Sequence, residues 1–159
     1  MTIHHFSQLV HRQAEKYGKE IAFRHKDKST GEWISTTWNS FSKQVKTVAK
    51  SMASIGVKVQ ENIATYTQNK PEGIIVDFAA YANRAVVIPL YATSSESQIE
   101  YIINEAEIRF LFVGEQFQYD NAFRSKKNCP TLEHIIVFDR SVKLDESDKS
   151  SLYYEDFIK

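Results

Sequence analysis

Four short apolar runs recur at nearly constant spacing in the second part of the sequence. They are Ile63–Tyr66, Val86–Leu90, Phe110–Val113 and Ile135–Phe138, and their first residues lie 23, 24 and 25 positions apart. Helical patterns fill the segments between them. Parallel neighbouring strands need a crossover of about a dozen residues or more, so this spacing predicts successive βαβ units. We therefore expect an α/β fold, a three-layer sandwich with a parallel sheet of about four strands.

The first crossover is expected to form a helix that begins near Pro71. Proline suits a first helical turn, and Asn69 is a candidate N-cap. Asp77 and Arg84 fall off the expected apolar face, so we interpret them as a solvated pair. The expected apolar face consists of Ile74, Ile75, Phe78, Ala79 and Ala82.

The next crossover begins with a capping box, in which Ser95 and Gln98 satisfy two amides at the start of a helix. Its expected buried stripe is Ile99, Ile102, Ile103 and Ala106. Residues 115–129 form a weaker helical pattern, and residues 142–151 read as a charged loop. The last residues, SLYYEDFIK, are interpreted as the start of another element.

Residues 1–60 predict a helix, a β-hairpin and a second helix. Gly18 is positioned to end the first helix, and the runs Ile21–His25 and Trp33–Thr37 flank the turn sequence DKSTGE. Thr37 is a candidate N-cap for the second helix, and Gly56 can end it. The first helix is marked by Phe6, Leu9, Val10 and Tyr17, and the second by Phe41, Val45, Val48, Ala49, Met52 and Ile55.

Charge and cysteine content exclude several classes of protein. The 20 basic residues balance 20 acidic ones, so we expect no nucleic acid partner. The single cysteine, Cys129, is typical of a reducing compartment and of a buried structural thiol. No segment approaches the roughly 20 apolar residues of a membrane span, and we expect a cytoplasmic location. His4 and His5 lack spaced partners, so we expect no metal site.

Pro89 interrupts the second apolar run just before a burst of hydroxyl side chains. Proline lacks the amide hydrogen that a strand donates, so we interpret Pro89 as the end of ladder pairing. Leu90, Tyr91, Ala92 and Thr93 would then form a loop at the carboxyl edge of the sheet, where open α/β sheets bind ligands. An ordinary strand-to-helix connection is the alternative interpretation.

Two stretches resemble a known family. TTWNSF is similar to the first core motif of the adenylate-forming acyl-CoA synthetases, and QNKPEGIIVDFAAYANRAVVIPLYATSSESQIEYIINEAEIRFLFV resembles the long stretch that follows it. The resemblance is closest to bacterial long-chain fatty acid ligases and extends from Phe6 to about Phe157. Two positions depart from the family pattern, which usually has Glu where Ser40 stands and Gly near Arg84.

The resemblance implies a parent enzyme that joins a fatty acid to ATP as an acyl adenylate and then passes the acyl group to coenzyme A. Magnesium would accompany ATP. The loop Leu90, Tyr91, Ala92 and Thr93 would border the coenzyme A channel. The family's phosphate loop, adenosine-binding segment and catalytic lysine are absent from the 159 residues, so we assign no catalytic residue and expect the chain itself to be inactive.

The resemblance also implies that residues 1–159 are the N-terminal part of a large AMP-binding domain. Within it, residues 1–60 carry the helix, hairpin and helix, residues 61–140 the βαβ units, and residues 141–159 a loop and the start of the next element. In a chain cut from a larger domain, Tyr153, Tyr154 and Phe157 are expected to lie exposed and to favour self-association.

Two other hypotheses stay open on the sequence. The chain could be a stand-alone small α/β binding or interaction module, and the reading frame beyond Lys159 distinguishes this from a ligase. A flavodoxin-like nucleotide protein has less support, because TYTQNKPEG offers no glycine before its helix to form an anion-binding loop.

Overall fold

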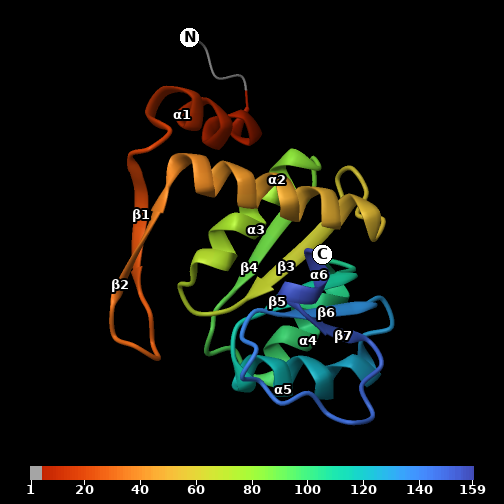
Figure 1. Cartoon of the computed structure of the whole chain (residues 1–159). Coiled ribbons are helices and arrows are strands. Elements are labelled where there is room, and N and C mark those ends of the chain that lie inside the picture. Colours follow the sequence, from red (N-terminus) through yellow and green to blue (C-terminus); the bar gives the residue numbers. More distant parts are fainter. Residues whose placement is uncertain (1–4) are drawn as a thin grey trace.

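The computed structural model describes residues 5–159, and His4 lies outside the described residues (Figure 1). The helices are η1 (Phe6–Gln8), α1 (Leu9–Tyr17), α2 (Trp38–Ser54), α3 (Pro71–Ala82), α4 (Glu96–Glu105), α5 (Gln116–Ser125), η2 (Lys126–Asn128) and α6 (Tyr154–Phe157). The strands are β1 (Ile21–Lys26), β2 (Trp33–Thr37), β3 (Asn62–Tyr66), β4 (Val86–Leu90), β5 (Phe110–Val113), β6 (His134–Val137) and β7 (Ser151–Tyr153).

The main sheet has five strands in the order β4-β3-β5-β6-β7, and every neighbouring pair is parallel. The four predicted strands are confirmed, and β7 adds the fifth. The strands β1 and β2 pair with each other as a separate antiparallel hairpin, as predicted. In Figure 1 this hairpin stands apart from the sheet at one side of the molecule.

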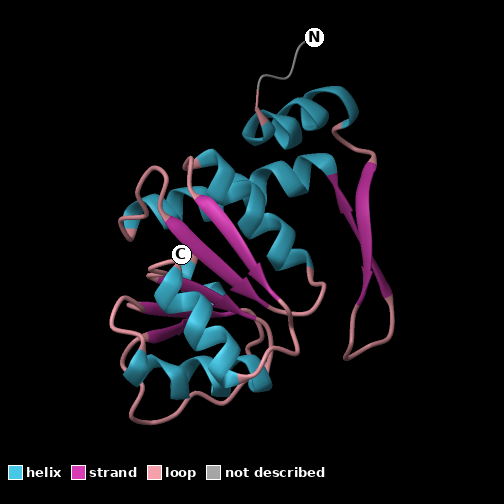
Figure 2. Cartoon of the chain, turned by 180° about the vertical axis from the view of Figure 1, so that it is seen from behind, coloured by secondary structure: helices cyan, strands magenta, loops and turns pink. Residues whose placement is uncertain are grey.

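Two hydrophobic cores lie on opposite faces of the sheet and make the fold a three-layer sandwich (Figure 2). Helices α2 and α3 cover one face, and α4 and α5 cover the other. Each strand contributes alternate residues to the two cores, as Ile63 and Ala64 do in β3. Cys129 is buried in the second core, which agrees with a structural role.

The predicted helix signals are mostly confirmed. The Thr37 hydroxyl accepts a hydrogen bond from the Ser40 amide at 3.2 Å, and Ser95 and Gln98 form the expected capping box. Asn69, however, is not the cap of α3: Lys70 occupies that position and its side chain makes no capping bond. Arg84 has a φ of 58°, a left-handed conformation that glycine adopts more easily, which explains the family's usual glycine there.

The buried side of α3 differs from the predicted one. The helix buries Ile75, Val76, Ala79 and Ala80, whereas Ile74 is 42% exposed and Ala82 is also exposed. The shift arises because α3 lies between α2 and the sheet, so apolar side chains on two sides of the helix are covered. Ile74 faces a cleft instead of the core.

The expectation of exposed C-terminal aromatic side chains is wrong for Tyr154 and Phe157, and Tyr153 is half-buried. Tyr154 and Phe157 are 9% and 7% exposed, and both pack in the first core with Phe138 and Phe112. Strand β7 pairs with β6, which places the following residues against the first core. Residues 151–157 therefore add a strand to the sheet and apolar side chains to the core on one of its faces. The self-association predicted from these residues therefore loses its basis.

Candidate functional site

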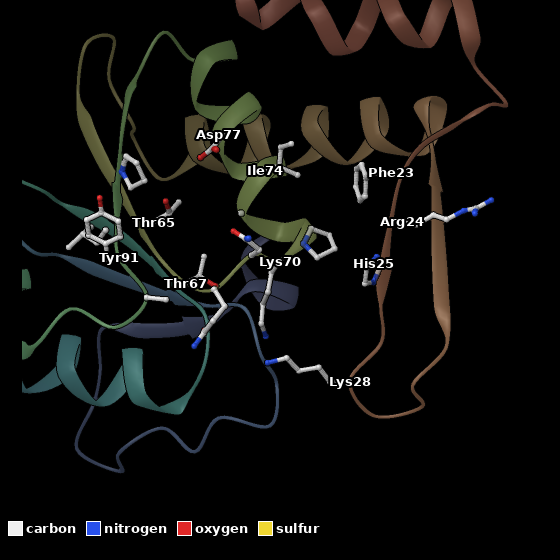
Figure 3. Close-up of a pocket in the computed structure, with 17 residues that line it drawn as sticks. Phe23, Arg24, His25, Lys28, Thr65, Thr67, Lys70, Ile74, Asp77 and Tyr91 are labelled. Carbon is white, nitrogen blue, oxygen red and sulfur yellow. The ribbon is translucent and has the colours of Figure 1, made fainter.

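A cleft of about 1030 Å³ lies at the carboxyl ends of β3 and β4 (Figure 3). The hairpin strand β1 forms one wall, with Phe23 and His25 facing the cleft. The start of α3 and the residues after β3 and β4 form the other walls. The cleft thus combines two parts of the chain that are far apart in sequence.

Sheet topology explains the location of this cleft. The chain passes from β3 to β4 on one side and then returns to β5 on the other side of β3. Loops that leave neighbouring strands in opposite directions open a crevice at the carboxyl edge, which is where open α/β sheets bind ligands. The β3 end lies at this reversal.

Three of the four residues in the predicted loop line the cleft. Leu90, Tyr91 and Ala92 line it, and Thr93 does not. Tyr91 is 85% exposed. Leu90 is not a loop residue, because it pairs with Tyr66 and is buried, so the prediction that pairing ends at Pro89 is wrong by one residue. Strand β4 is an edge strand, and proline is tolerated on an edge.

Specific hydrogen bonds fix this loop to the body of the protein. The Gln118 side chain, fully buried in α5, donates to the Ala92 carbonyl at 2.7 Å. The Ser94 amide donates to the Tyr91 carbonyl at 2.9 Å, and the Tyr66 hydroxyl donates to the Ser94 carbonyl. The Tyr91 ring therefore projects from an anchored backbone, although it is itself exposed.

Charged side chains join the hairpin to the sheet at one end of the cleft. The Lys70 ammonium lies 3.4 Å from Asp139 and 3.7 Å from Glu115, and Lys28 of the hairpin turn region also pairs with Glu115. In Figure 3 the two lysine side chains approach each other. Hydrogen bonds from Ser141 hold the pKa of Asp139 below its ordinary value.

Several residues that line the cleft carry polar side-chain atoms without a partner among the described residues. The Thr67 hydroxyl and His25 Nδ1 are buried without a hydrogen bond. Thr65 and Asp77 also line the cleft, and their side chains make no hydrogen bond or ion pair with residues 5–159. Burial raises the pKa of Asp77. The sequence interpretation of Asp77 as half of a solvated pair with Arg84 is therefore wrong.

Residues 5–159 contain neither a metal-binding cluster nor a membrane-spanning helix. No group of three or more His, Cys, Asp or Glu side chains there could hold a metal ion. Among these same residues, no helix has the length and apolar character needed to cross a bilayer.

Known proteins match this chain in sequence and in fold. A long-chain-fatty-acid–CoA ligase of Mycobacterium bovis is 30% identical over 106 residues, which are 67% of this chain and 18% of the ligase. Human long-chain-fatty-acid–CoA ligase 1 is 28% identical over 112 residues, 68% of this chain and 16% of the ligase. The chain thus spans less than a fifth of the length of these relatives.

Solved structures give the same picture of the fold. Coronafacic acid ligase from Pectobacterium brasiliense superposes with a TM-score of 0.83 at 18% identity, over 96% of this chain and 29% of that one. An anthranilate CoA ligase in complex with anthranoyl-AMP gives 0.80 at 20% identity, over 96% and 27%. The family described as AMP-binding enzyme matches residues 10–157. The chain therefore belongs to the AMP-binding enzyme family, which includes the adenylate-forming acyl-CoA ligases that it matches.

Proposed function

We propose that residues 1–159 form the N-terminal part of the large AMP-binding domain of a long-chain fatty acid–CoA ligase. The observation that carries the proposal is the family match over residues 10–157, together with relatives that are named as long-chain ligases. In the proposed reaction, a fatty acid carboxylate attacks the α-phosphorus of ATP and displaces pyrophosphate. The thiol of coenzyme A then attacks the acyl adenylate and displaces AMP.

The chain supplies scaffold and channel wall to this reaction, not the reacting groups. The triphosphate charge must be neutralised during adenylation, in this proposal by magnesium and by the family's phosphate loop. The 159 residues contain no such loop and do not fit ATP or magnesium by themselves. Residues that contact ATP would lie in other parts of the ligase.

The cleft supports a role in admitting coenzyme A. It has a volume of about 1030 Å³, it lies at the carboxyl edge of the sheet, and its walls combine apolar groups such as Pro89 and Ile74 with polar ones. The pantetheine arm has the same mixed character, with methylene groups between amides. We propose that Leu90, Tyr91 and Ala92 border the path of this arm, whereas Thr93, which was predicted with them, lies outside the lining of the cleft.

A cytoplasmic location is part of the same proposal. Burial raises the pKa of the Cys129 thiol to about 11, so this only cysteine is an inert core residue. A chain with one buried thiol is compatible with a reducing compartment.

The test is to read the encoding gene beyond codon 159 and to assay the protein made from the complete reading frame. Palmitate-dependent exchange of pyrophosphate into ATP and formation of palmitoyl-CoA are the expected activities. A reading frame that ends at Lys159 in the native gene would contradict the proposal and favour a stand-alone α/β binding module. A complete protein that lacks both activities would also contradict it.

A further inference from the structure

We propose that the outer side of helix α2 binds to a membrane surface that contains anionic phospholipids. Three lysines of α2, Lys43, Lys46 and Lys50, form this basic face, which lies outside the cleft at the carboxyl edge of the sheet. The inference concerns where the protein docks, not the chemistry of the proposed reaction. The choice of a bilayer as the partner rests on the proposed function, because a long-chain fatty acid partitions into bilayers.

The neutral net charge of the chain conceals an uneven distribution along the sequence. Residues 1–58 contain 10 lysine and arginine residues and 4 aspartate and glutamate residues, whereas residues 59–159 contain 10 and 16. The first part of the chain is therefore basic and the second part acidic. An asymmetry of this kind is typical of proteins that bind membranes or nucleic acids, even where the total charge is zero.

Helix α2 gathers positive charge on one side. Its 17 residues include Lys43, Lys46 and Lys50 and no acidic residue. The spacing of three and four residues aligns these lysines on one side of the helix, where all three are exposed. Their side chains form no ion pair or hydrogen bond with residues 5–159. Neighbouring like charges destabilise a helix, and solvated helix faces usually mix both signs, so this unmixed row indicates an anionic partner.

The surroundings of the basic face contain little negative charge. Figure 1 shows α1 beside α2, and a groove of about 550 Å³ lies between the two helices. The three lysines line this groove together with Asn39, Ser42 and Thr47. Among the described residues, Glu15 is the only acidic one in the lining, and it lies 3.3 Å from His11 Nε2. Amide and hydroxyl groups beside ammonium groups can donate hydrogen bonds to the phosphate oxygens of lipid headgroups.

The length of the lysine row favours an extended anionic surface over a single anion. Lys43 and Lys50 are two helical turns apart, roughly 10 Å along the helix axis, so one phosphate group cannot contact both. Attraction of lysines to anionic lipids does not require the insertion of apolar side chains. This fits α2, because its apolar side is buried in the first core and is not available to a bilayer.

The acidic part of the chain would orient the protein on such a surface. Helix α4 contains Glu96, Glu100 and Glu105 and neither lysine nor arginine. It covers the face of the sheet opposite to α2, so an anionic surface repels this side of the molecule while it attracts the basic face. The lysine row has no arginine or aromatic side chain, with which proteins read or stack on bases, so a bilayer is favoured over a nucleic acid.

The experiment measures co-sedimentation of the 159-residue chain with lipid vesicles. At low salt, the chain should bind vesicles of phosphatidylcholine mixed with phosphatidylglycerol but not vesicles of phosphatidylcholine alone. Binding should be lost near 1 M salt, where the Debye length falls to about 3 Å. Each lysine near an anionic surface contributes about fivefold, so Lys46→Gln should weaken binding by about that factor. Replacement of Lys43, Lys46 and Lys50 together by glutamine should weaken it roughly a hundredfold.

The matched control removes the same charge from the second part of the chain. Lys127, Lys143 and Lys149 are also exposed, and their side chains form no ion pair with any described residue. Their combined replacement by glutamine should change vesicle binding by less than about threefold. Both triple variants should keep the melting temperature of the parent, because glutamine suits helices about as well as lysine and unpaired surface charges add little stability. Equal weakening by the two triple variants would show a response to net charge alone and would overturn the inference.

Other anions test the choice of partner. Release of the chain from vesicles by inorganic phosphate, but not by chloride at equal ionic strength, would show a site for a single anion instead of a membrane surface. Tighter binding to duplex DNA than to vesicles at equal phosphate concentration, lost in the triple variant of the basic face, would show a nucleic acid surface. Either result overturns the inference, as does a parent chain that fails to bind the mixed vesicles.

The protein made from the complete reading frame provides the last test. Its binding to the mixed vesicles should depend on the same three lysines. Binding that does not change in the triple variant would mean that other parts of the ligase cover the basic face, and the inference would then be wrong. Ligase activity is measured without vesicles, so the proposed function and this inference can fail separately.

Discussion

At the scale of single residues, Gly114 shows how closely two loops approach each other beneath the cleft. It follows β5, and its amide donates to the Tyr66 carbonyl at 3.0 Å. A Cβ at this position would clash with the Thr67 hydroxyl oxygen and would lie 3.1 Å from the Thr67 Cα. A new rotamer of Thr67 could not relieve the second contact, because it involves the backbone.

We therefore expect Gly114→Ala to destabilise the protein by about 1–3 kcal/mol, the usual effect of overpacking. Gly73→Ala is the matched control, since a Cβ there meets only the Thr67 methyl group at 3.6 Å. Alanine favours helices, so Gly73→Ala should raise stability by up to about 1 kcal/mol. Urea unfolding of the two variants measures both effects, and a Gly114→Ala protein as stable as the parent would refute the close approach.

Tyr91 allows a residue-scale test of the proposed coenzyme A channel. Its ring is 85% exposed but stands on a backbone anchored through Ala92 and Gln118, so its removal should leave the fold intact. In the complete ligase, Tyr91→Ala should impair thioester formation, measured with coenzyme A, more than adenylation, measured by pyrophosphate exchange. Equal loss in both half-reactions with a lower melting temperature would assign Tyr91 to packing alone.

At the scale of elements, one turn joins β1 to β2, the two strands of the hairpin that forms a wall of the cleft. The Asp27 carboxylate accepts hydrogen bonds from the amides of Ser29 and Thr30 at 2.9 and 2.7 Å and from both of their hydroxyl groups. These bonds, that of the Ser29 hydroxyl foremost, lower the pKa of Asp27 to about 2. Gly31 completes the turn with a φ of 74°.

This turn should loosen in acid. Because the folded-state pKa of Asp27 is lowered, its stabilising effect is present above the unfolded-state value of about 3.9 and is lost as the pH falls through the folded-state value. Exchange of the Thr30 amide should therefore be protected at pH 5 and should lose protection toward pH 2, after correction for the intrinsic exchange rate. Asp27→Asn keeps an acceptor that does not titrate, and its corrected protection should not change over this range. Identical profiles for parent and variant would contradict the prediction.

The elements themselves were largely predictable from local patterns. The apolar runs at positions 63, 86, 110 and 135 are four of the five parallel strands, and the caps at Thr37 and Ser95 are confirmed. Strand β7 was missed because Ser151–Tyr153 is too short to show a periodic pattern. Its pairing with β6 is set by tertiary contacts, and so is the burial of Tyr154 and Phe157.

The cleft could be predicted only in part. Leu90, Tyr91 and Ala92 were expected at the carboxyl edge because parallel topology places such loops there. Asp77 and Thr65 carried no such signal, since a polar residue on a helix and a threonine in a strand are both ordinary. The two residues line one cleft only because the hairpin, α3 and β3 come together in the folded protein. A local sequence pattern does not predict this tertiary arrangement.

At the scale of the whole molecule, the cleft joins an N-terminal hairpin to a sheet that begins at residue 62. The ion pair of Lys28 with Glu115 connects positions 87 residues apart in the sequence, and Lys70 connects Glu115 to Asp139. The walls of the cleft thus come from elements that pack together only when the fold is complete. A surface of this kind can position a ligand only in the folded protein.

We accordingly expect the 159-residue chain alone to bind without catalysing. Adenylation requires neutralisation of the triphosphate and alignment of the carboxylate with the α-phosphorus, and the phosphate loop and catalytic lysine that the family resemblance assigns to these tasks are not among residues 1–159. Palmitate-dependent exchange of labelled pyrophosphate into ATP should stay at the level of a blank without enzyme, with magnesium present throughout. An active long-chain ligase assayed in parallel controls for the reagents, and far-UV circular dichroism controls for the fold. Exchange clearly above the blank, retained through purification, would mean that this chain holds an adenylation site of its own.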